Sequence, residues 1–240
     1  DSKKTLVLDT VKHFDTFTQA SKQLDLHKKL SYGRGLVLLF YGPSGTGKTM
    51  LAHSLATLLR KKILLVNFPQ LGTNEAGAIT KMLFREATIH NALVFFDECE
   101  SVFQSRDRDP SHRVNTLLTE IERYDGLVIL ATNRADEIDE AMHRRITLAI
   151  QFTKPNHVLR EQIWASLKPP RLQLSEDVNL DALAHKYELS GGFIKNAWMA
   201  AIGFAVAGRD SGKGSTKEKI ANAANATAAT GNGGDGAVSS

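Results

Sequence analysis

The stretch Gly42-Pro43-Ser44-Gly45-Thr46-Gly47-Lys48-Thr49 decides the fold, because it fits the pattern G-x-x-x-x-G-K-[S/T]. An apolar run at 36–41 precedes it, and leucines recur at helical spacing from 51 to 59. In this strand-to-helix setting, glycines let backbone N–H groups face phosphate oxygens, Lys48 reaches the β- and γ-phosphates, and the Thr49 hydroxyl binds Mg²⁺. A dinucleotide loop is disfavoured, because the glycines run G-x-x-G-x-G and are followed by Lys-Thr. We therefore expect a nucleotide-phosphate site here.

A pair of acidic residues follows a second apolar run. Residues 92–96 read as a buried strand that leads directly into Asp97 and Glu98. Ligands of open α/β sheets lie beyond the carboxyl ends of the strands, so Asp97 is placed to hold Mg²⁺. A second carboxylate directly after it is placed to activate a water molecule for attack on the γ-phosphate. The pair therefore favours nucleotide hydrolysis over phosphoryl transfer to a small molecule.

Two further polar sites follow along the chain. Asn133 ends the strand-like run 127–131, which places it beside Glu98 at the same sheet edge, where it would orient the attacking water. Arg144 and Arg145 lie between a predicted helix at 136–142 and the run 148–152. They are either a solvated pair or salt bridge, or a finger that stabilises transition-state charge on a neighbouring subunit's γ-phosphate.

The whole chain alternates apolar runs with helical patterns. Runs at 36–41, 63–67, 92–96, 127–131 and 148–152 predict five strands of a mostly parallel α/β sheet, with helices on both faces. Residues 1–154 are predicted to form this large domain, and a lead-in at 1–30 is expected to contribute a helix that packs through Leu24, Leu26 and Leu30. Residues 155–208 predict a small helical lid whose core includes both tryptophans. The Ala/Gly/Asn-rich tail, 209–240, is predicted to be disordered.

Composition excludes several classes of protein. The chain has 240 residues, of which 42% are hydrophobic, and a mild net charge of +4, which argues against a nucleic-acid-binding domain. The single cysteine, Cys99, excludes a disulfide framework and is expected to be a small buried residue. The apolar runs are shorter than the ~20 residues that span a bilayer. With no signal peptide visible, we expect an intracellular, cytoplasmic protein, and a fragment or processed product because it begins at Asp1.

Together these motifs resemble those of the AAA ATPases, a clade of the AAA+ superfamily. The matching stretches are 42–49 (GPSGTGKT), 93–98 (LVFFDE), 131–133 (ATN), 139–145 (DEAMHRR) and 190–197 (SGGFIKNA). The resemblance implies a P-loop NTPase fold with a five-stranded parallel sheet and a helical lid. It also implies hexameric rings that use ATP and Mg²⁺ to remodel, unfold or disassemble a protein substrate.

The resemblance also assigns roles by position. It implies that Glu98 activates water, Asn133 is the sensor-1 residue, and Arg145 is the primary arginine finger with Arg144 beside it. The implied ATP contacts are Gly42, Pro43, Ser44, Gly45, Thr46, Gly47, Lys48, Thr49, Asp97, Gly191 and Gly192, with Thr49 and Asp97 also holding Mg²⁺.

The chain departs from the family pattern after its second strand. Many members carry an aromatic–hydrophobic–Gly pore loop there, whereas residues 68–72 read FPQLG, with Gln70 at the aromatic position. The adenine-contacting segment is not recognisable in residues 1–30. A sensor-2 arginine is absent, as in the AAA clade itself.

Two other functions remain open from the sequence. One is a nucleic-acid motor or loader of the wider AAA+ group, against which the mild charge and the absent sensor-2 arginine argue. The other is a ring scaffold that binds ATP without hydrolysing it, against which the presence of Glu98 and Asn133 argues.

Overall fold

The computed structural model describes residues 2–24, 35–67, 76–99, 111–134, 140–170, 172, 174, 178–207 and 224. The chain divides into two compact units. The first consists of Asp1–Gly42 and Lys48–Phe152, and the second of Pro43–Gly47 and Thr153–Ser240.

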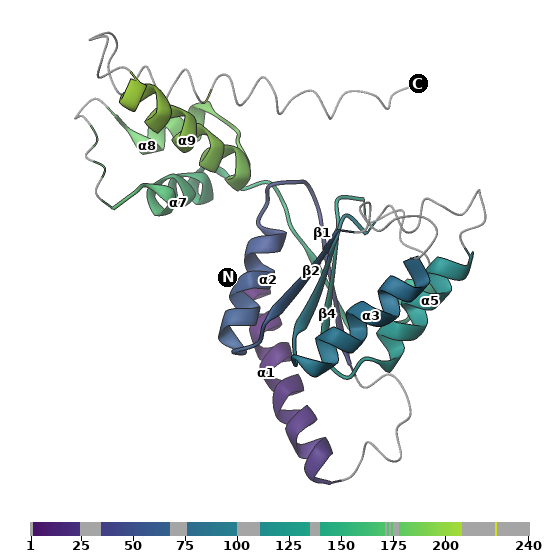
Figure 1. Ribbon diagram of the computed structural model, residues 1–240. Helices are drawn as coiled ribbons and strands as arrows, with labels where there is room; N and C mark the ends of the chain where they lie inside the picture. The colour runs from purple at the N-terminus through teal and green to yellow at the C-terminus, as the bar shows by residue number, and fades with distance from the viewer. Residues whose placement is uncertain are drawn as a thin grey trace. The chain divides into compact units, whose positions relative to one another are not determined.

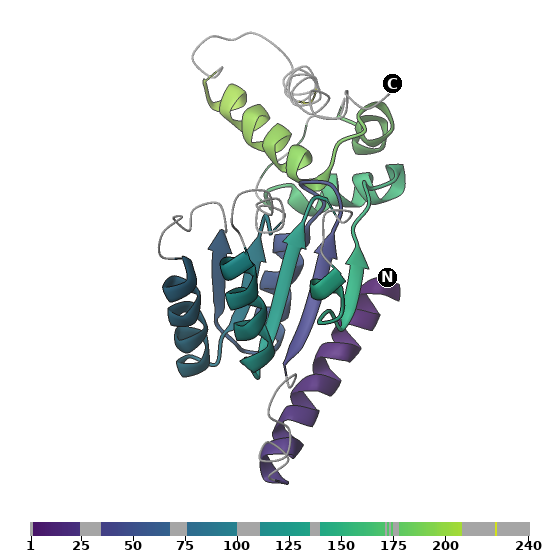
Figure 2. The same ribbon diagram turned by 90° about the vertical axis from the view of Figure 1, so that its right-hand side faces the viewer.

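A five-stranded sheet forms the centre of the first unit (Figure 1). Its strands lie in the order β2-β3-β4-β1-β5. All neighbouring strands pair in parallel, and Figure 2 shows the sheet broadside. The strands are β1 (Leu36–Tyr41), β2 (Ile63–Asn67), β3 (Leu93–Asp97), β4 (Leu127–Thr132) and β5 (Leu148–Gln151). Each strand begins and ends within one residue of the predicted range. The predicted α/β fold with a parallel sheet is therefore confirmed.

Burial follows the position of each strand in the sheet. The three inner strands are buried almost throughout, which explains why β1, β3 and β4 are continuous apolar runs without alternation. The edge strands β2 and β5 are only partly buried. Because all five strands run parallel, the segments that follow β1, β3 and β4 all begin at the carboxyl end of the sheet, where ligands of such folds bind.

Helices cover both faces of the sheet (Figure 1). On one face lie α1 (Ser2–Gln23) and α2 (Lys48–Leu58), and on the other lie α3 (Ala76–Ile89) and α5 (Ser111–Arg123). Side chains alternate between the faces along each strand. In β3, Leu93 and Phe95 join the core beneath α1 and α2, whereas Val94 and Phe96 join the core beneath α3 and α5. The second core also contains Cys99, which confirms the prediction that this thiol is a buried residue.

The N-terminal helix packs through residues other than those predicted. α1 buries Val7 and Val11, which lie one helical turn apart on the face turned to the sheet. Leu24 follows the last helical residue and is 69% exposed, while Leu26 and Leu30 lie outside the described residues. The prediction that Leu24 packs was therefore wrong, because the helix ends before it and uses an earlier apolar stripe.

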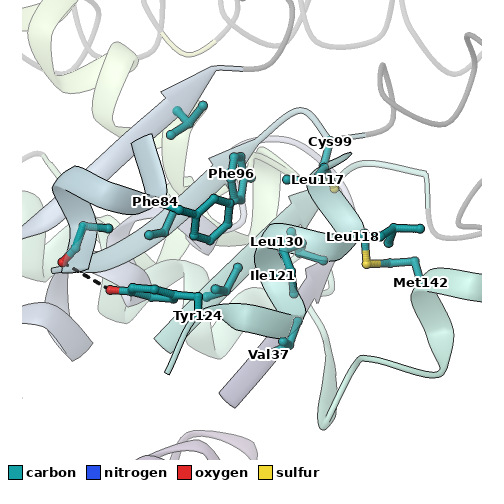
Figure 3. Packing of buried hydrophobic residues seen from close by; sticks show 14 of the residues in the cluster. Val37, Phe84, Phe96, Cys99, Leu117, Leu118, Ile121, Tyr124, Leu130 and Met142 are labelled. Carbon is teal, nitrogen blue, oxygen red and sulfur yellow. Dashed lines mark hydrogen bonds between the residues drawn. The ribbon is translucent and has the colours of Figure 1, made fainter. Parts of the chain in front are cut away.

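Tyr124 directly follows α5 and is buried in the core beneath α3 and α5. Its ring contacts the ring of Phe84, which in turn contacts Phe96 (Figure 3). Its hydroxyl donates a hydrogen bond to the Ala92 carbonyl oxygen. Burial, with a smaller contribution from the negative charge of Asp125, raises the pKa of Tyr124 to about 12.

This raised pKa predicts a loss of stability at high pH. The folded state favours the neutral phenol. The contribution of Tyr124 to the free energy of unfolding is therefore complete below about pH 10, the pKa of tyrosine in the unfolded chain, and is lost as the pH rises through the folded-state pKa of about 12. We expect Tyr124→Phe to cost about 1–3 kcal/mol near neutral pH, because the Ala92 carbonyl loses its partner, and this cost should shrink above pH 10.

The measurement is urea unfolding at a series of pH values. Far-ultraviolet circular dichroism is the suitable signal, because Trp164 and Trp198 both lie in the second unit. A stability difference between wild type and Tyr124→Phe that stays constant up to pH 11.5 would contradict the assigned pKa.

Three helices form the described core of the second unit: α7 (His157–Leu167), α8 (Leu180–Lys186) and α9 (Gly191–Ala207). Asn156 and Asn179 cap the first two helices, since each side chain accepts a backbone N–H of the first turn. Trp164 and Trp198 are buried with their rings edge to face, and the indole N–H of Trp198 donates to the Trp164 carbonyl. The prediction that both tryptophans belong to the helical core is confirmed.

Other predictions on the layout of the chain fall partly outside the described residues. The domain limits at 154 and 208 stay predictions. Of the predicted disordered tail at 209–240, only Ala224 is described, and it is buried with the core of the second unit. The helix predicted at 136–142 appears as α6 (Glu140–His143), and residues 135–139 lie outside the described part. None of the described helices is long and apolar enough to cross a membrane.

Candidate nucleotide-binding site

Gly42 ends the central strand in a conformation that other residues avoid. Its φ is +134°, and its N–H donates to the Thr132 carbonyl at 3.2 Å. A Cβ on Gly42 would lie 2.0 Å from the carbonyl oxygen of Phe152. The first glycine of the loop therefore lets the chain leave the sheet between two neighbouring strands without a clash.

Lys48 joins three elements at the carboxyl end of the sheet. It is the first residue of α2 and is only 7% exposed. Its ammonium donates to the Gly42 carbonyl at 2.6 Å and to the Asn133 side-chain oxygen at 2.8 Å. A largely buried cation at a helix N-terminus is an arrangement that attracts the phosphate groups of a nucleotide. Lys48 and Asn133 are 85 positions apart in the sequence, and they meet because β1 and β4 are neighbouring strands.

Thr49 and Asp97 form a second pair at the carboxyl end of the sheet. The Thr49 hydroxyl lies 3.4 Å from a carboxylate oxygen of Asp97. Both groups are hard oxygen donors, and Mg²⁺ is usually held by one or two carboxylates together with water and substrate phosphates. No group of three or more His, Cys, Asp or Glu side chains suited to a metal occurs among the described residues. The pair therefore fits a magnesium ion that shares its coordination with nucleotide phosphates.

Glu98 has a strained backbone directly after β3. Its φ is +53°, a value uncommon for residues other than glycine, asparagine and aspartate. Its N–H donates to a carboxylate oxygen of Asp97 at 3.0 Å, and the next N–H, of Cys99, donates to the Ala131 carbonyl at 3.0 Å. These bonds hold the turn against β4 and leave the Glu98 side chain exposed. Such strain at a sheet edge is a feature of functional sites.

The two arginines lie in the turn after α6 and differ in their surroundings. Arg144 is exposed. Arg145 is partly buried, and its guanidinium lies 2.6 Å from a carboxylate oxygen of Glu122 on α5. Its backbone N–H donates to the Met142 carbonyl. The structure thus contains the salt bridge that the sequence left open as one alternative, and the role of Arg145 as a finger stays a prediction.

The middle of the phosphate loop belongs to the second unit. Within that unit, the Gly192 N–H donates to the Gly45 carbonyl at 2.9 Å, and a Cβ on Gly45 would lie 2.5 Å from the Ser190 hydroxyl oxygen. The Thr46 hydroxyl donates to the Pro43 carbonyl at 2.8 Å. The predicted contacts of the loop and lid with ATP, at Gly42, Pro43, Ser44, Gly45, Thr46, Gly47, Gly191 and Gly192, stay predictions.

Sequence reasoning missed two residues near these groups. Glu122 carries no local signal, because its contact with Arg145 joins segments 23 positions apart in the chain. Asn67 ends β2 and pairs in register with Asp97. The signal that singled out Asn133, a polar residue at the end of an apolar strand, also marks Asn67. The predicted pore loop at 68–72 lies outside the described residues.

Comparison with known proteins identifies the family. Residues 38–154 match the family described as ATPase family associated with various cellular activities (AAA). The chain is 35% identical to a putative 26S proteasome regulatory subunit homologue of Methanocaldococcus jannaschii, over 68% of this chain and 47% of the relative. It is 33% identical to a human peroxisomal ATPase, over 71% of this chain and 14% of the relative. It is also 33% identical to a vesicular-fusion protein of Candida albicans, over 67% of this chain and 24% of the relative.

The chain spans less than half the length of these relatives. The matched region contains four of the five strands in full, β1 from Leu38 onward, and every predicted catalytic residue. Fold, motif order and family match agree. The chain therefore belongs to the AAA family of ATPases.

Proposed function

We propose that this chain is a magnesium-dependent ATPase module that splits the bond between the β- and γ-phosphates of ATP. The observation that carries the proposal is the pairing of Lys48 with Asn133 and of Thr49 with Asp97 at the carboxyl end of one sheet. These pairs supply a cation for phosphate, oxygen donors for Mg²⁺ and an amide for water. Glu98 follows Asp97 directly and adds the base.

Each residue has one task in the proposed reaction. Lys48 binds the β- and γ-phosphates, and Asn133 orients a water molecule against the γ-phosphorus. Glu98 accepts a proton from this water as its oxygen forms the new bond to phosphorus. The bond to the bridging oxygen breaks, and ADP and inorganic phosphate leave. When bound, Mg²⁺ neutralises charge on the phosphate oxygens.

The proposal extends to assembly and to the kind of substrate. Arg145 would act on the γ-phosphate of a neighbouring subunit, which requires repeated contacts between copies of the chain, as in a hexameric ring. The relatives include a putative proteasome regulatory subunit homologue and a vesicular-fusion protein. Those names favour a protein substrate that is remodelled, unfolded or disassembled.

Lys48→Met tests the binding part of the proposal. Methionine keeps most of the length of this buried side chain but removes the ammonium and its charge, so we expect ATP to bind about 10–100-fold more weakly. The measurement is a titration with a fluorescent ATP analogue in the presence of Mg²⁺. Lys62→Met, at an exposed lysine before β2, is the control and should bind like wild type. Equal affinity of Lys48→Met and wild type would contradict the assigned phosphate site.

A further inference from the structure

Asn67 lies at the carboxyl end of the sheet, where the proposed site lies. It is the last residue of β2, and its partner in the parallel register is Asp97, the last residue of β3. Residues in register on neighbouring parallel strands project from the same face of the sheet. The face on which Asp97 lies therefore also decides where the Asn67 side chain lies.

Two independent observations identify that face. Asp97 lies within 3.4 Å of Thr49 on α2, and Leu93 and Phe95, which alternate with it along β3, pack beneath α1 and α2. In β2, Ile63 packs against the same core, whereas Val66 belongs to the opposite one. Asn67 thus shares the face of Asp97 and of the helix that carries Thr49.

The side-chain oxygen of Asn67 is buried and accepts no hydrogen bond from the described residues. A buried acceptor without a donor costs about 1–3 kcal/mol, so folded proteins rarely keep one that no ligand or water satisfies. The neighbouring Asp97 carboxylate and Thr49 hydroxyl are the groups assigned to Mg²⁺. The position of this acceptor points to a donor that arrives with the metal.

We propose that the Asn67 side-chain oxygen accepts a hydrogen bond from a water molecule bound to Mg²⁺, and so positions the ion against Asp97 and Thr49. Mg²⁺ gives up its water reluctantly and usually keeps several water molecules when it binds to proteins with nucleotides. Residues next to its direct ligands therefore meet these water molecules, which are strong donors. This inference rests on the proposed function, because it assumes that nucleotide and Mg²⁺ bind at this site.

The test separates affinity for the metal from affinity for the nucleotide. Asn67→Leu keeps the branching of the side chain and removes the acceptor. Binding of a non-hydrolysable ATP analogue is measured as free Mg²⁺ is raised, and again in EDTA. We expect about tenfold weaker Mg²⁺ binding, as is usual when a residue that hydrogen-bonds to a metal ligand is lost, with nucleotide affinity in EDTA unchanged.

Stability without ligands gives a second readout that a purely structural asparagine would not produce. Replacing an acceptor that lacks a donor removes a desolvation cost, so Asn67→Leu should unfold at the same or a higher urea concentration than wild type. Gln151→Leu is the matched control, since it changes an amide at the end of the opposite edge strand, β5. This control should leave Mg²⁺ affinity unchanged.

Asn67→Asp distinguishes the acceptor from the amide donor, because aspartate keeps an acceptor oxygen. We expect it to bind Mg²⁺ at least as tightly as wild type. The inference is overturned if Asn67→Leu binds Mg²⁺ like wild type, if Asn67→Asp binds it tenfold more weakly, or if Asn67→Leu also loses affinity in EDTA. Wild type that binds no nucleotide would overturn the proposed function together with this inference.

Discussion

Replacing Glu98 by glutamine is expected to lower kcat for ATP hydrolysis by about 10²–10⁴-fold while ATP still binds. Glutamine has nearly the shape of glutamate but cannot take a proton from the attacking water. The side chain of Glu98 is exposed beyond β3, so the substitution removes no core contact. The measurement is steady-state release of inorganic phosphate, with ATP affinity determined separately.

Glu86→Gln is the matched control for this experiment. Glu86 lies on α3, which covers the face of the sheet opposite to α2, and pairs with His90 one helical turn later. The control should hydrolyse ATP like wild type. Turnover by Glu98→Gln within threefold of wild type would contradict the assignment of Glu98 as the base.

Arg145→Ala is expected to lower kcat by about 10³-fold or more with little change in KM for ATP, because a trans-acting guanidinium stabilises charge that develops only in the transition state. In the structure the guanidinium forms an ion pair with Glu122. Wild-type turnover per chain should also rise with protein concentration, since the proposed shared site needs an arginine from a neighbouring subunit. The measurement is phosphate release over a series of enzyme concentrations.

Mixing the two inactive variants tests whether the arginine acts on a neighbour. An Arg145→Ala chain keeps Glu98, and a Glu98→Gln chain keeps Arg145, so roughly a quarter of the interfaces in a random mixed ring would hold both groups. Activity should therefore return on mixing. Arg123→Ala, at an exposed arginine on α5, is the control and should be active alone. A mixture as inactive as its components would contradict a shared site.

The sheet was predictable because its strands obey one simple physical rule. A strand covered by helices on both faces must be apolar at every position, so β1, β3 and β4 are visible as unbroken runs. The location of the candidate site was predictable from the same rule, because a polar residue that directly follows such a run must lie at the carboxyl end of the sheet. Asp97 and Asn133 were predicted in this way, and the observed contacts with Thr49 and Lys48 agree with their predicted places.

What the sequence did not predict depends on contacts between distant segments. The Arg145–Glu122 ion pair joins a turn to α5, and neither residue carries a pattern that selects the other. α1 packs through Val7 and Val11 and not through Leu24, because the helix ends before Leu24 and the stripe that it buries is set by contact with the sheet. Asn67 meets the rule that found Asn133, but its proposed role depends on the burial of one oxygen atom, which is decided by packing in the folded chain.

The identity of the retained nucleotide tests the central claim most directly. Wild type and Glu98→Gln are each incubated with radiolabelled ATP and Mg²⁺, separated from free nucleotide by gel filtration, and analysed by chromatography. We expect wild type to retain ADP and Glu98→Gln to retain ATP. Retention of no nucleotide by either protein, or of ADP by both, would contradict a site in which Lys48 holds the phosphates and Glu98 activates water.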